Sequence, residues 1–160
     1  MNKIVGKEYL SEKIVKLEVE APLIAKSRRA GHFVIVRVGE KGERTPYTIA
    51  SSDIKRGTIT LVVQLVGKSS QKVGALEVDD YITDLVGPLG KATNIENFGT
   101  VVCAGGGVGI APMLPIIEAM SKAGNKVVAV LGARTKDLVI LEDQVKEFAD
   151  EVIVMTDDGK

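Results

Sequence analysis

The pattern of hydrophobic and polar residues along the chain changes near Gly90. Before that point, apolar residues come in short stretches that are rich in β-branched side chains or alternate with polar ones, as β-strands do. The clearest of these stretches are residues 14–20, 32–38, 58–66 and 81–86. Glycine-containing turns separate most of them, and only residues 69–76 favour a short helix. The pattern predicts an antiparallel barrel of six strands.

After a loop-rich passage at residues 87–99, strand and helix patterns alternate. Strands are expected at residues 100–104, 126–131 and 151–155, with helices at residues 111–123 and 141–149. This order predicts a partial parallel sheet of about three strands with crossover helices, as in one half of a doubly wound Rossmann-like fold. The expected fold class is therefore β followed by α/β, with domains at residues 1–97 and 98–160.

Composition excludes several classes of function. The 160 residues are 45% hydrophobic and carry 21 basic and 21 acidic side chains, so the chain lacks the net positive charge of a general nucleic-acid binder. No apolar stretch approaches the roughly 20 residues of a membrane span, and the first residues lack the apolar core of a signal peptide. These features predict a cytoplasmic protein without a membrane span.

Two residue types that often carry chemistry occur only once each. Cys103 cannot form an intrachain disulfide or hold a metal centre by itself, and it is expected to be a small buried strand residue. His32, the single histidine, is expected at the start of a strand rather than in catalysis. No metal ligands and no acid, base or nucleophile constellation are predicted.

The sequence GGGVGIAP follows the strand expected at residues 100–104. It does not fit the fingerprint G-x-G-x-x-G, because the last glycine is replaced in either alignment. Its glycines allow left-handed backbone angles and leave N–H groups open to a phosphate, and a proline suits the first turn of the helix that follows. A tight strand-to-helix connection is the alternative. The expected nucleotide contacts are Gly105, Gly106, Gly107, Val108, Gly109, Ala111 and Pro112.

Two further residues follow the second and third parallel strands, and they are expected at the same ligand-facing edge. Arg134 can hold the adenosine ribose or its 2′-phosphate, which favours NADP slightly over NAD, while a solvated loop arginine is the alternative. Asp157 is expected along that edge as well, where capping of a following helix explains it equally well.

The predicted barrel contains the motif RTPYT at residues 44–48. Arg44 can pair with a phosphate, and Pro46 restricts the backbone. Tyr47 offers a flat aromatic face and Thr48 a hydroxyl group. Taken alone, an edge strand with a surface arginine explains this motif better.

A second barrel motif, VGKSS at residues 66–70, changes that balance. Ser69 or Ser70 can cap the short helix that follows, whose free N–H groups would face an anion. Two anion sites and an aromatic side chain in one barrel predict a phosphate-bearing dinucleotide with a ring system.

Five motifs together resemble the ferredoxin-NADP reductase superfamily, and they span nearly the whole chain in its order. They are RTPYT at 44–48, VGKSS at 66–70, GPLG at 87–90, GGGVGIAP at 105–112 and GAR at 132–134. The resemblance is greatest to electron-transfer subunits of the dihydroorotate dehydrogenase type and of the sulfide dehydrogenase type, which is the ferredoxin-NADP reductase alpha subunit.

The resemblance implies a flavin-binding barrel followed by an NAD(P)-binding α/β domain. The implied activity is hydride transfer between NAD(P)H and FAD, with electrons passed to an iron-sulfur acceptor such as a ferredoxin-like protein or a catalytic partner subunit. Relatives of this type continue beyond TDDG at residues 156–159 with the rest of the nucleotide domain and a cysteine cluster for [2Fe-2S]. That cluster is therefore expected in a further segment or in a partner. The alternative is a non-catalytic FAD- or nucleotide-binding module that needs a partner subunit.

The resemblance also implies roles for individual residues. Arg44 would contact an FAD phosphate, Tyr47 would pack against the flavin or its ribityl chain, and Thr48 would hydrogen-bond near flavin N5. Tyr47 and Thr48 are thus the expected catalytic residues, with Pro46 beside them. The further FAD contacts implied are Gln64, Leu65, Val66, Gly67, Ser69 and Ser70. One departure is the sequence GKSS, where relatives usually have GKGT.

Overall fold

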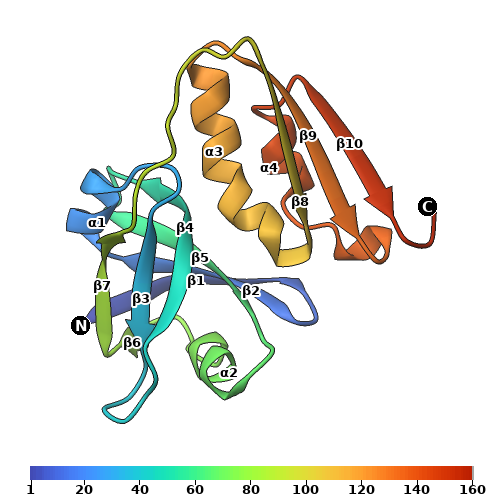
Figure 1. Ribbon diagram of the computed structural model, residues 1–160. Coiled ribbons are helices and arrows are strands. Elements are labelled where there is room, and N and C mark those ends of the chain that lie inside the picture. Colours follow the sequence, from blue (N-terminus) through green and yellow to red (C-terminus); the bar gives the residue numbers. More distant parts are fainter. Residues whose placement is uncertain (160) are drawn as a thin grey trace. The chain divides into compact units, whose positions relative to one another are not determined.

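The computed structural model describes residues 1–159 of the chain, which form two compact units with the boundary between Ala92 and Thr93. Figure 1 labels their helices and strands. The first unit contains β1 (Asn2–Ser11), β2 (Ile14–Glu20), α1 (Pro22–Ser27), β3 (Phe33–Arg37), β4 (Thr45–Asp53), β5 (Thr58–Gln64), α2 (Lys68–Gly74), β6 (Tyr81–Ile82) and β7 (Asp84–Leu89).

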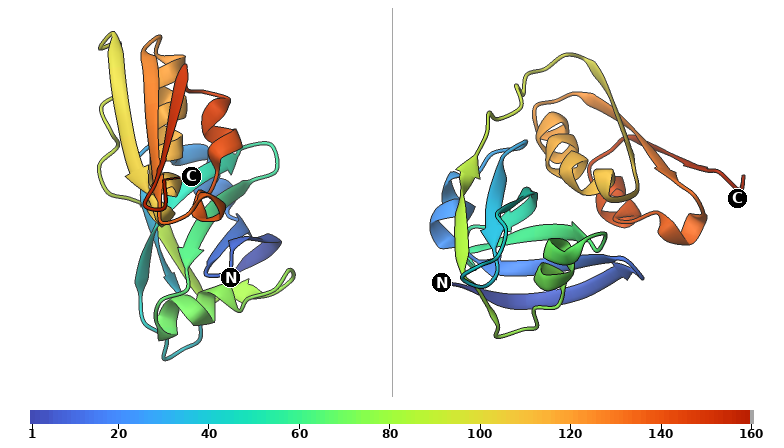
Figure 2. Two further views of the ribbon diagram at one scale, coloured as in Figure 1. Left: turned by 90° about the vertical axis from the view of Figure 1, so that its right-hand side faces the viewer. Right: turned by 60° about the horizontal axis from the view of Figure 1, so that its bottom comes forward.

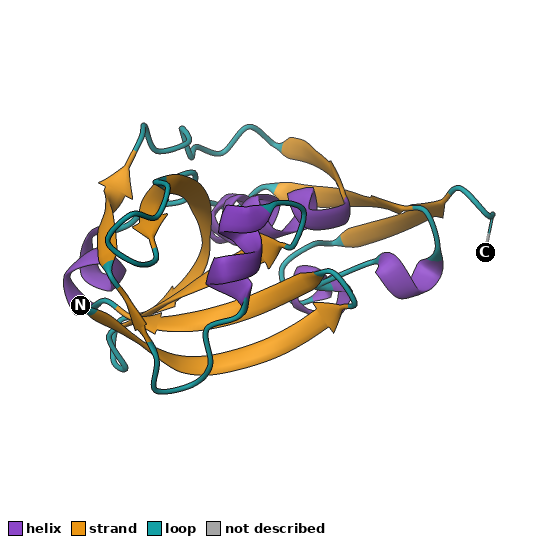
Figure 3. Ribbon diagram, turned by 90° about the horizontal axis from the view of Figure 1, so that it is seen from below, coloured by secondary structure: helices purple, strands orange, loops and turns teal. Residues whose placement is uncertain are grey.

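The strands of the first unit form one sheet in the order β6-β1-β2-β5-β4-β3-β7, and every neighbouring pair is antiparallel. Its two outer strands, β6 and β7, follow each other in the chain with only Thr83 between them. The sheet must therefore curl until its two edges meet, and the curvature is visible in Figure 3. The predicted antiparallel barrel is confirmed, with seven strands where six were expected.

The barrel encloses apolar side chains from alternating strand positions. Leu17 of β2 lies opposite Leu61 of β5, and Val19 lies opposite Ile59; all four are fully buried. Full burial of side chains of this size contributes about 1.5–3 kcal/mol each, so this packing fixes which face of each strand points inward.

Two elements of the barrel, α1 and β1, were not expected, and β4 was considered only as an edge strand. Helix α1 has Pro22 at its start, and only Ile24 and Ala25 are buried, so its six residues are too few to show a helical period. Strand β1 has Ile4 as its one buried residue and therefore shows no alternation. The stretch at residues 81–86 was read as one strand, but Thr83 divides it into β6 and β7.

The second unit contains β8 (Thr100–Gly106), α3 (Ile110–Lys122), β9 (Lys126–Ala133), α4 (Glu142–Lys146) and β10 (Glu151–Thr156). Short 3₁₀ turns stand at Gly107–Gly109 and Lys136–Leu138. The strands pair in parallel in the order β10-β9-β8, which confirms the predicted α/β arrangement. Pro115 lies buried inside α3, which continues to Lys122.

The two faces of this three-stranded sheet differ in what covers them. Helices α3 and α4 lie on one face of the sheet, as the left view of Figure 2 shows. Val127, Ala129 and Leu131 of β9 are fully buried, so their side chains point to that face. On the opposite face, Val102 is 66% exposed and Met155 is 61% exposed. Among the described residues of this unit, no helix covers that second face.

Asn125, which lies between α3 and β9, fastens the segment that precedes β8. Its side-chain amide donates hydrogen bonds to the backbone oxygens of Glu96 and Met120, at 2.8 and 2.9 Å. Its side-chain oxygen accepts one from the N–H of Phe98 at 2.6 Å. Because Asn125 is buried, these bonds satisfy backbone groups that would otherwise lose water without compensation.

The same substitution on the two faces of the sheet should have unequal effects. Val127→Ala removes two buried methyl groups and is expected to lower the free energy of unfolding by about 2 kcal/mol. Val102→Ala, on the exposed face, is expected to change it by less than about 0.5 kcal/mol. Urea unfolding followed by circular dichroism measures both values, and equal losses would contradict the assignment of the faces.

Candidate functional site

The RTPYT motif lies at the beginning of β4, which is an interior strand between β3 and β5 rather than an edge strand. Tyr47 lies opposite Val34 of β3, and its ring packs against the barrel core. Successive side chains of a strand point to opposite faces, so Pro46 and Thr48 lie on the other face of β4 from Tyr47. The structure therefore places Tyr47 and Thr48, the two expected catalytic residues, on different faces of one strand.

The Tyr47 hydroxyl is a buried polar group without a hydrogen-bond partner within residues 1–159. Burial raises the pKa of Tyr47, and the Thr45 side chain lies close enough to lower that pKa in part, although this contact lacks the geometry of a hydrogen bond. A buried hydroxyl without a partner costs free energy that a ligand with a suitable polar atom would recover. This atom is the feature of the barrel that best fits a bound polar cofactor.

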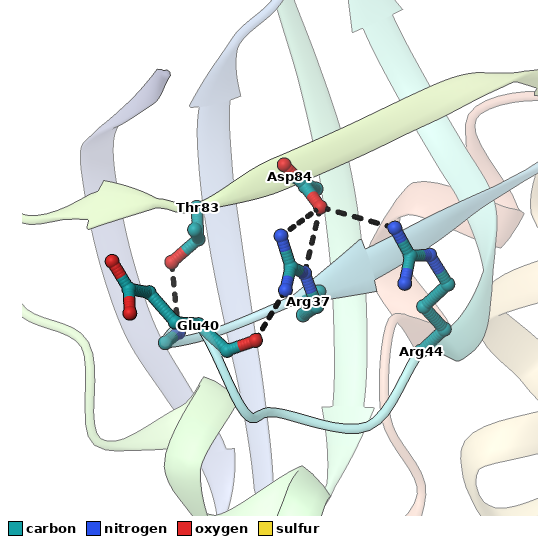
Figure 4. Close-up of polar contacts among 6 residues, drawn as sticks. Arg37, Glu40, Arg44, Thr83 and Asp84 are labelled. Carbon is teal, nitrogen blue, oxygen red and sulfur yellow. Dashed lines mark hydrogen bonds and ion pairs between the residues drawn. The ribbon is translucent and has the colours of Figure 1, made fainter.

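Arg44, directly before β4, belongs to an ion-pair cluster that Figure 4 shows. Its Nη2 lies 3.3 Å from Oδ2 of Asp84, and its side chain is 61% exposed. The same Oδ2 atom accepts from Nε and Nη2 of Arg37, at 2.6 and 2.5 Å. A guanidinium has five N–H groups, so most of those on Arg44 remain available to another anion.

The VGKSS turn leads into α2, whose N-cap is Gly67 and not one of the two serines. Ser70 instead reaches back: its hydroxyl oxygen accepts from the N–H groups of Val66 and Gly67, at 3.1 and 3.0 Å. The Ser69 hydroxyl hydrogen-bonds to the Glu43 carboxylate, next to Arg44. That bond brings the two predicted anion-binding motifs of the barrel side by side.

At the end of β5 the side chains are exposed, while the next two backbone N–H groups are already hydrogen-bonded within the chain. The N–H of Leu65 donates to the carbonyl of Lys13 at 2.8 Å, and that of Val66 is already bound to Ser70. Gln64 is exposed, and the Val66 side chain is 74% exposed.

The glycine-rich sequence joins β8 to α3 as expected. Gly107 has a φ of +53°, which favours glycine, and a Cβ at Gly107 or Gly109 would meet no atom within 4 Å. A Cβ at Gly105 would lie 3.1 Å from the carbonyl oxygen of Gly109, so a side chain here would require its neighbours to shift by a few tenths of an ångström. Ala111 is buried in α3 and can face a ligand only through its backbone.

The parallel register places the other predicted nucleotide contacts at one edge of the sheet. Gly106, Gly132 and Met155 lie abreast on the three strands. Arg134 follows β9 directly, is exposed, and forms no ion pair in the described part of the chain. Asp157 follows β10, and its N–H donates to the carbonyl of Ala133 at 3.1 Å. The glycine loop, Arg134 and Asp157 thus share the carboxyl edge, where open α/β sheets bind ligands.

The single histidine and the single cysteine are both buried at or next to strands. His32 is buried directly before β3, and its Nδ1 accepts a hydrogen bond from the N–H of Arg29 at 3.1 Å. Cys103 is buried in β8, and burial raises the pKa of its thiol. The described residues hold no cluster of potential metal ligands and no helix long and apolar enough to cross a membrane.

Three residues beside the predicted site were not found from the sequence. They are Arg37, Asp84 and Glu43, which contact Arg44 or Ser69 or fix their partners. Glu43 directly precedes the RTPYT motif in the chain. Arg37 and Asp84 are 47 positions apart, and only the pairing of β3 with β7 brings them together.

Comparison with known proteins gives both units a counterpart. Residues 2–94 match the family of oxidoreductase FAD-binding domains, and residues 103–152 match that of oxidoreductase NAD-binding domains. A Thermotoga maritima protein named dihydroorotate dehydrogenase B (NAD(+)), electron transfer subunit homolog, is 44% identical over 99% of this chain and 56% of its own length. The Fusobacterium nucleatum dihydroorotate dehydrogenase B (NAD(+)), electron transfer subunit, is 29% identical over 90% of this chain and 57% of its own length. The chain spans about half the length of these curated relatives.

Solved structures agree with this assignment. The NADH-dependent reduced ferredoxin-NADP oxidoreductase, studied for flavin-based electron bifurcation, matches with a TM-score of 0.93 and 43% identity, over 98% of this chain and 57% of that one. Phthalate dioxygenase reductase matches with a TM-score of 0.82 at 20% identity, over 100% of this chain and 52% of that one, which shows the fold alone. The resemblance to the ferredoxin-NADP reductase superfamily is confirmed. The chain therefore belongs to the family of oxidoreductase FAD-binding domains, and its residues 103–152 are similar to the oxidoreductase NAD-binding domain.

Proposed function

We propose that the chain is the cofactor-binding part of a flavoprotein electron-transfer subunit that uses NAD(P)H and FAD. The observation that carries this proposal is the buried, unpartnered Tyr47 hydroxyl, which lies in the region that matches an FAD-binding domain. When bound, FAD supplies a centre that takes a hydride from the nicotinamide and releases its electrons to an acceptor. The protein's task is to bind and orient the two nucleotides.

In the barrel, Arg44 would pair with an FAD phosphate. The bound FAD would also supply the hydrogen-bond partner that the Tyr47 hydroxyl lacks. Thr48 and Pro46, on the other face of β4, would contact a different part of the cofactor from Tyr47. The Ser69 hydroxyl would exchange its bond to Glu43 for one to the pyrophosphate. The remaining contacts proposed are Gln64, Leu65, Val66, Gly67 and Ser70.

In the second unit, the open backbone at Gly107 and Gly109 would receive the pyrophosphate of the nicotinamide nucleotide, next to the start of α3. Gly105, Gly106, Val108, Ala111 and Pro112 would shape this turn. Arg134 would lie at the adenosine end, and Asp157 at the same carboxyl edge.

The acceptor of the electrons is proposed to be an iron-sulfur centre in a partner subunit or in a further segment. The named relatives are electron transfer subunits, and this chain covers 56% of the Thermotoga maritima one. That coverage also favours a second candidate, in which this chain binds FAD without turning over NAD(P)H.

Reconstitution with FAD followed by anaerobic addition of NADH or NADPH distinguishes these functions. The proposed oxidoreductase is expected to bind FAD, become yellow and lose its absorbance near the flavin maximum when the reduced nucleotide is added. A yellow protein that does not bleach would support the binding module. A protein that takes up no FAD would overturn both.

Tyr47→Phe provides a sharper test of the FAD site. The Tyr47 hydroxyl has no partner in the structure, so its removal is expected to leave the free energy of unfolding unchanged or slightly higher without FAD. Loss of the proposed hydrogen bond to bound FAD should weaken FAD binding about threefold to tenfold. Thermal unfolding and FAD fluorescence quenching measure the two effects. Unaltered FAD affinity would remove Tyr47 from the site.

Arg134→Ala tests the choice between NADPH and NADH. If Arg134 binds a 2′-phosphate, its loss should weaken NADPH binding about tenfold and leave NADH binding nearly unchanged. Stopped-flow reduction of the FAD-loaded protein at varied nucleotide concentration measures both affinities. Lys136→Ala is a suitable control, because it removes a nearby charge that is already paired with Glu142. Equal effects of Arg134→Ala on NADPH and NADH binding would show that Arg134 does not bind the 2′-phosphate.

A further inference from the structure

The loop between β3 and β4 is fastened to β7 by contacts that surround Asp84 (Figure 4). Arg37 ends β3 and lies directly opposite Asp84, the first residue of β7. The Arg37 guanidinium also donates to the carbonyl of Glu40, and the Thr83 hydroxyl oxygen accepts from the N–H of Gly39 at 2.7 Å. The loop that leads to Arg44 is thus held at several points by residues at one end of the β3–β7 pair.

Asp84 is shared unequally by its two arginines. Arg37 gives Oδ2 two close contacts, at 2.6 and 2.5 Å, whereas Arg44 gives it one at 3.3 Å. Arg37 is also the less exposed, with 21% of its side chain accessible against 61% for Arg44. Arg37 therefore makes the closer ion pair with the Asp84 carboxylate, and Arg44 makes one longer contact that leaves most of its N–H donors unused by Asp84.

An exposed arginine that binds a phosphate loses rotamer freedom when it does so, which opposes binding. A partner that already restricts the side chain reduces that loss. We propose that Asp84 is a positioning residue that holds the Arg44 guanidinium in place for an FAD phosphate, with Arg37 supplying the charge that keeps Asp84 from neutralising Arg44. This inference rests on the proposed function, because it takes FAD as the ligand of the barrel.

The test is a double-mutant cycle on binding of FAD and of riboflavin, a flavin without phosphate. Asp84→Asn is expected to weaken FAD binding about threefold to tenfold and to leave riboflavin binding unchanged. Arg44→Ala should weaken FAD binding more strongly, and Asp84→Asn should cause no further loss in the Arg44→Ala background. Fluorescence titration at one fixed salt concentration measures all affinities.

The cycle separates positioning from two simpler roles. Removing a negative charge without any positioning effect would tighten FAD binding, and it would do so in both backgrounds. A merely structural role would weaken FAD and riboflavin equally. Either result overturns the proposal, as does an unchanged FAD affinity in Asp84→Asn. If the unaltered protein binds no FAD, the proposed function fails as well; if Arg44→Ala weakens FAD binding but Asp84→Asn does not, only this inference fails.

Two variants guard against loss of folding as the explanation. Glu18→Gln breaks the ion pair with Arg56, in which Glu18 is 28% exposed against 33% for Asp84, and it should not alter FAD binding. Asp84→Glu keeps the charge opposite Arg37 but displaces the carboxylate by one methylene group. It should fold even if Asp84→Asn does not, and it should still weaken FAD relative to riboflavin. Equal affinities of Asp84→Glu and the unaltered protein for both flavins would also overturn the proposal.

Discussion

Closure of the seven-stranded sheet is the constraint on which the barrel and its candidate site depend. The outer strands β6 and β7 pair with β1 and β3 respectively, yet a single residue, Thr83, joins them. A sheet of this length can satisfy both pairings only by curling until its edges meet. The same residue binds the loop after β3, because its hydroxyl accepts from Gly39 and its N–H donates to Arg37. The same residue therefore contributes both to closure of the sheet and to fixation of the loop before Arg44.

The second unit is organised by a different constraint, the parallel register of its three strands. Parallel strands bring all their carboxyl ends to one edge, so a turn after β8 and residues after β9 and β10 become neighbours without any contact that specifies them individually. The alternation of side chains then divides the sheet into a face packed by α3 and α4 and a face that exposes Val102 and Met155. Parallel sheets usually have both faces covered, so this unit is the less complete of the two as an isolated hydrophobic core.

Local pattern was sufficient to predict the fold class, since β2, β5 and β9 show clear strand patterns and the glycine turn separates β8 from α3. It was insufficient for α1 and β1, whose few buried residues leave no period to detect. The motif residues of the candidate site were found because they are contiguous in sequence. Asp84 and Arg37 were not, because their relation depends on strand pairing across 47 positions. The N-cap at Gly67 was also missed, since the serine two or three positions later offered a stronger local signal than the backbone geometry.

The two candidate anion sites rest on different physical means. The barrel presents the exposed guanidinium of Arg44, which pairs with Asp84, and charge-assisted bonds to a phosphate are about twice as strong as bonds between neutral groups. The second unit presents backbone N–H groups at glycines whose surroundings are open, with the exposed Arg134 after the neighbouring strand. Under the proposed function, the barrel holds the cofactor that must remain bound between turnovers, and the glycine turn receives the nucleotide that must leave after each one. A restrained charge suits the first task because it lowers the entropy lost on binding, whereas an open backbone turn suits the second because it adds little to the barrier for release.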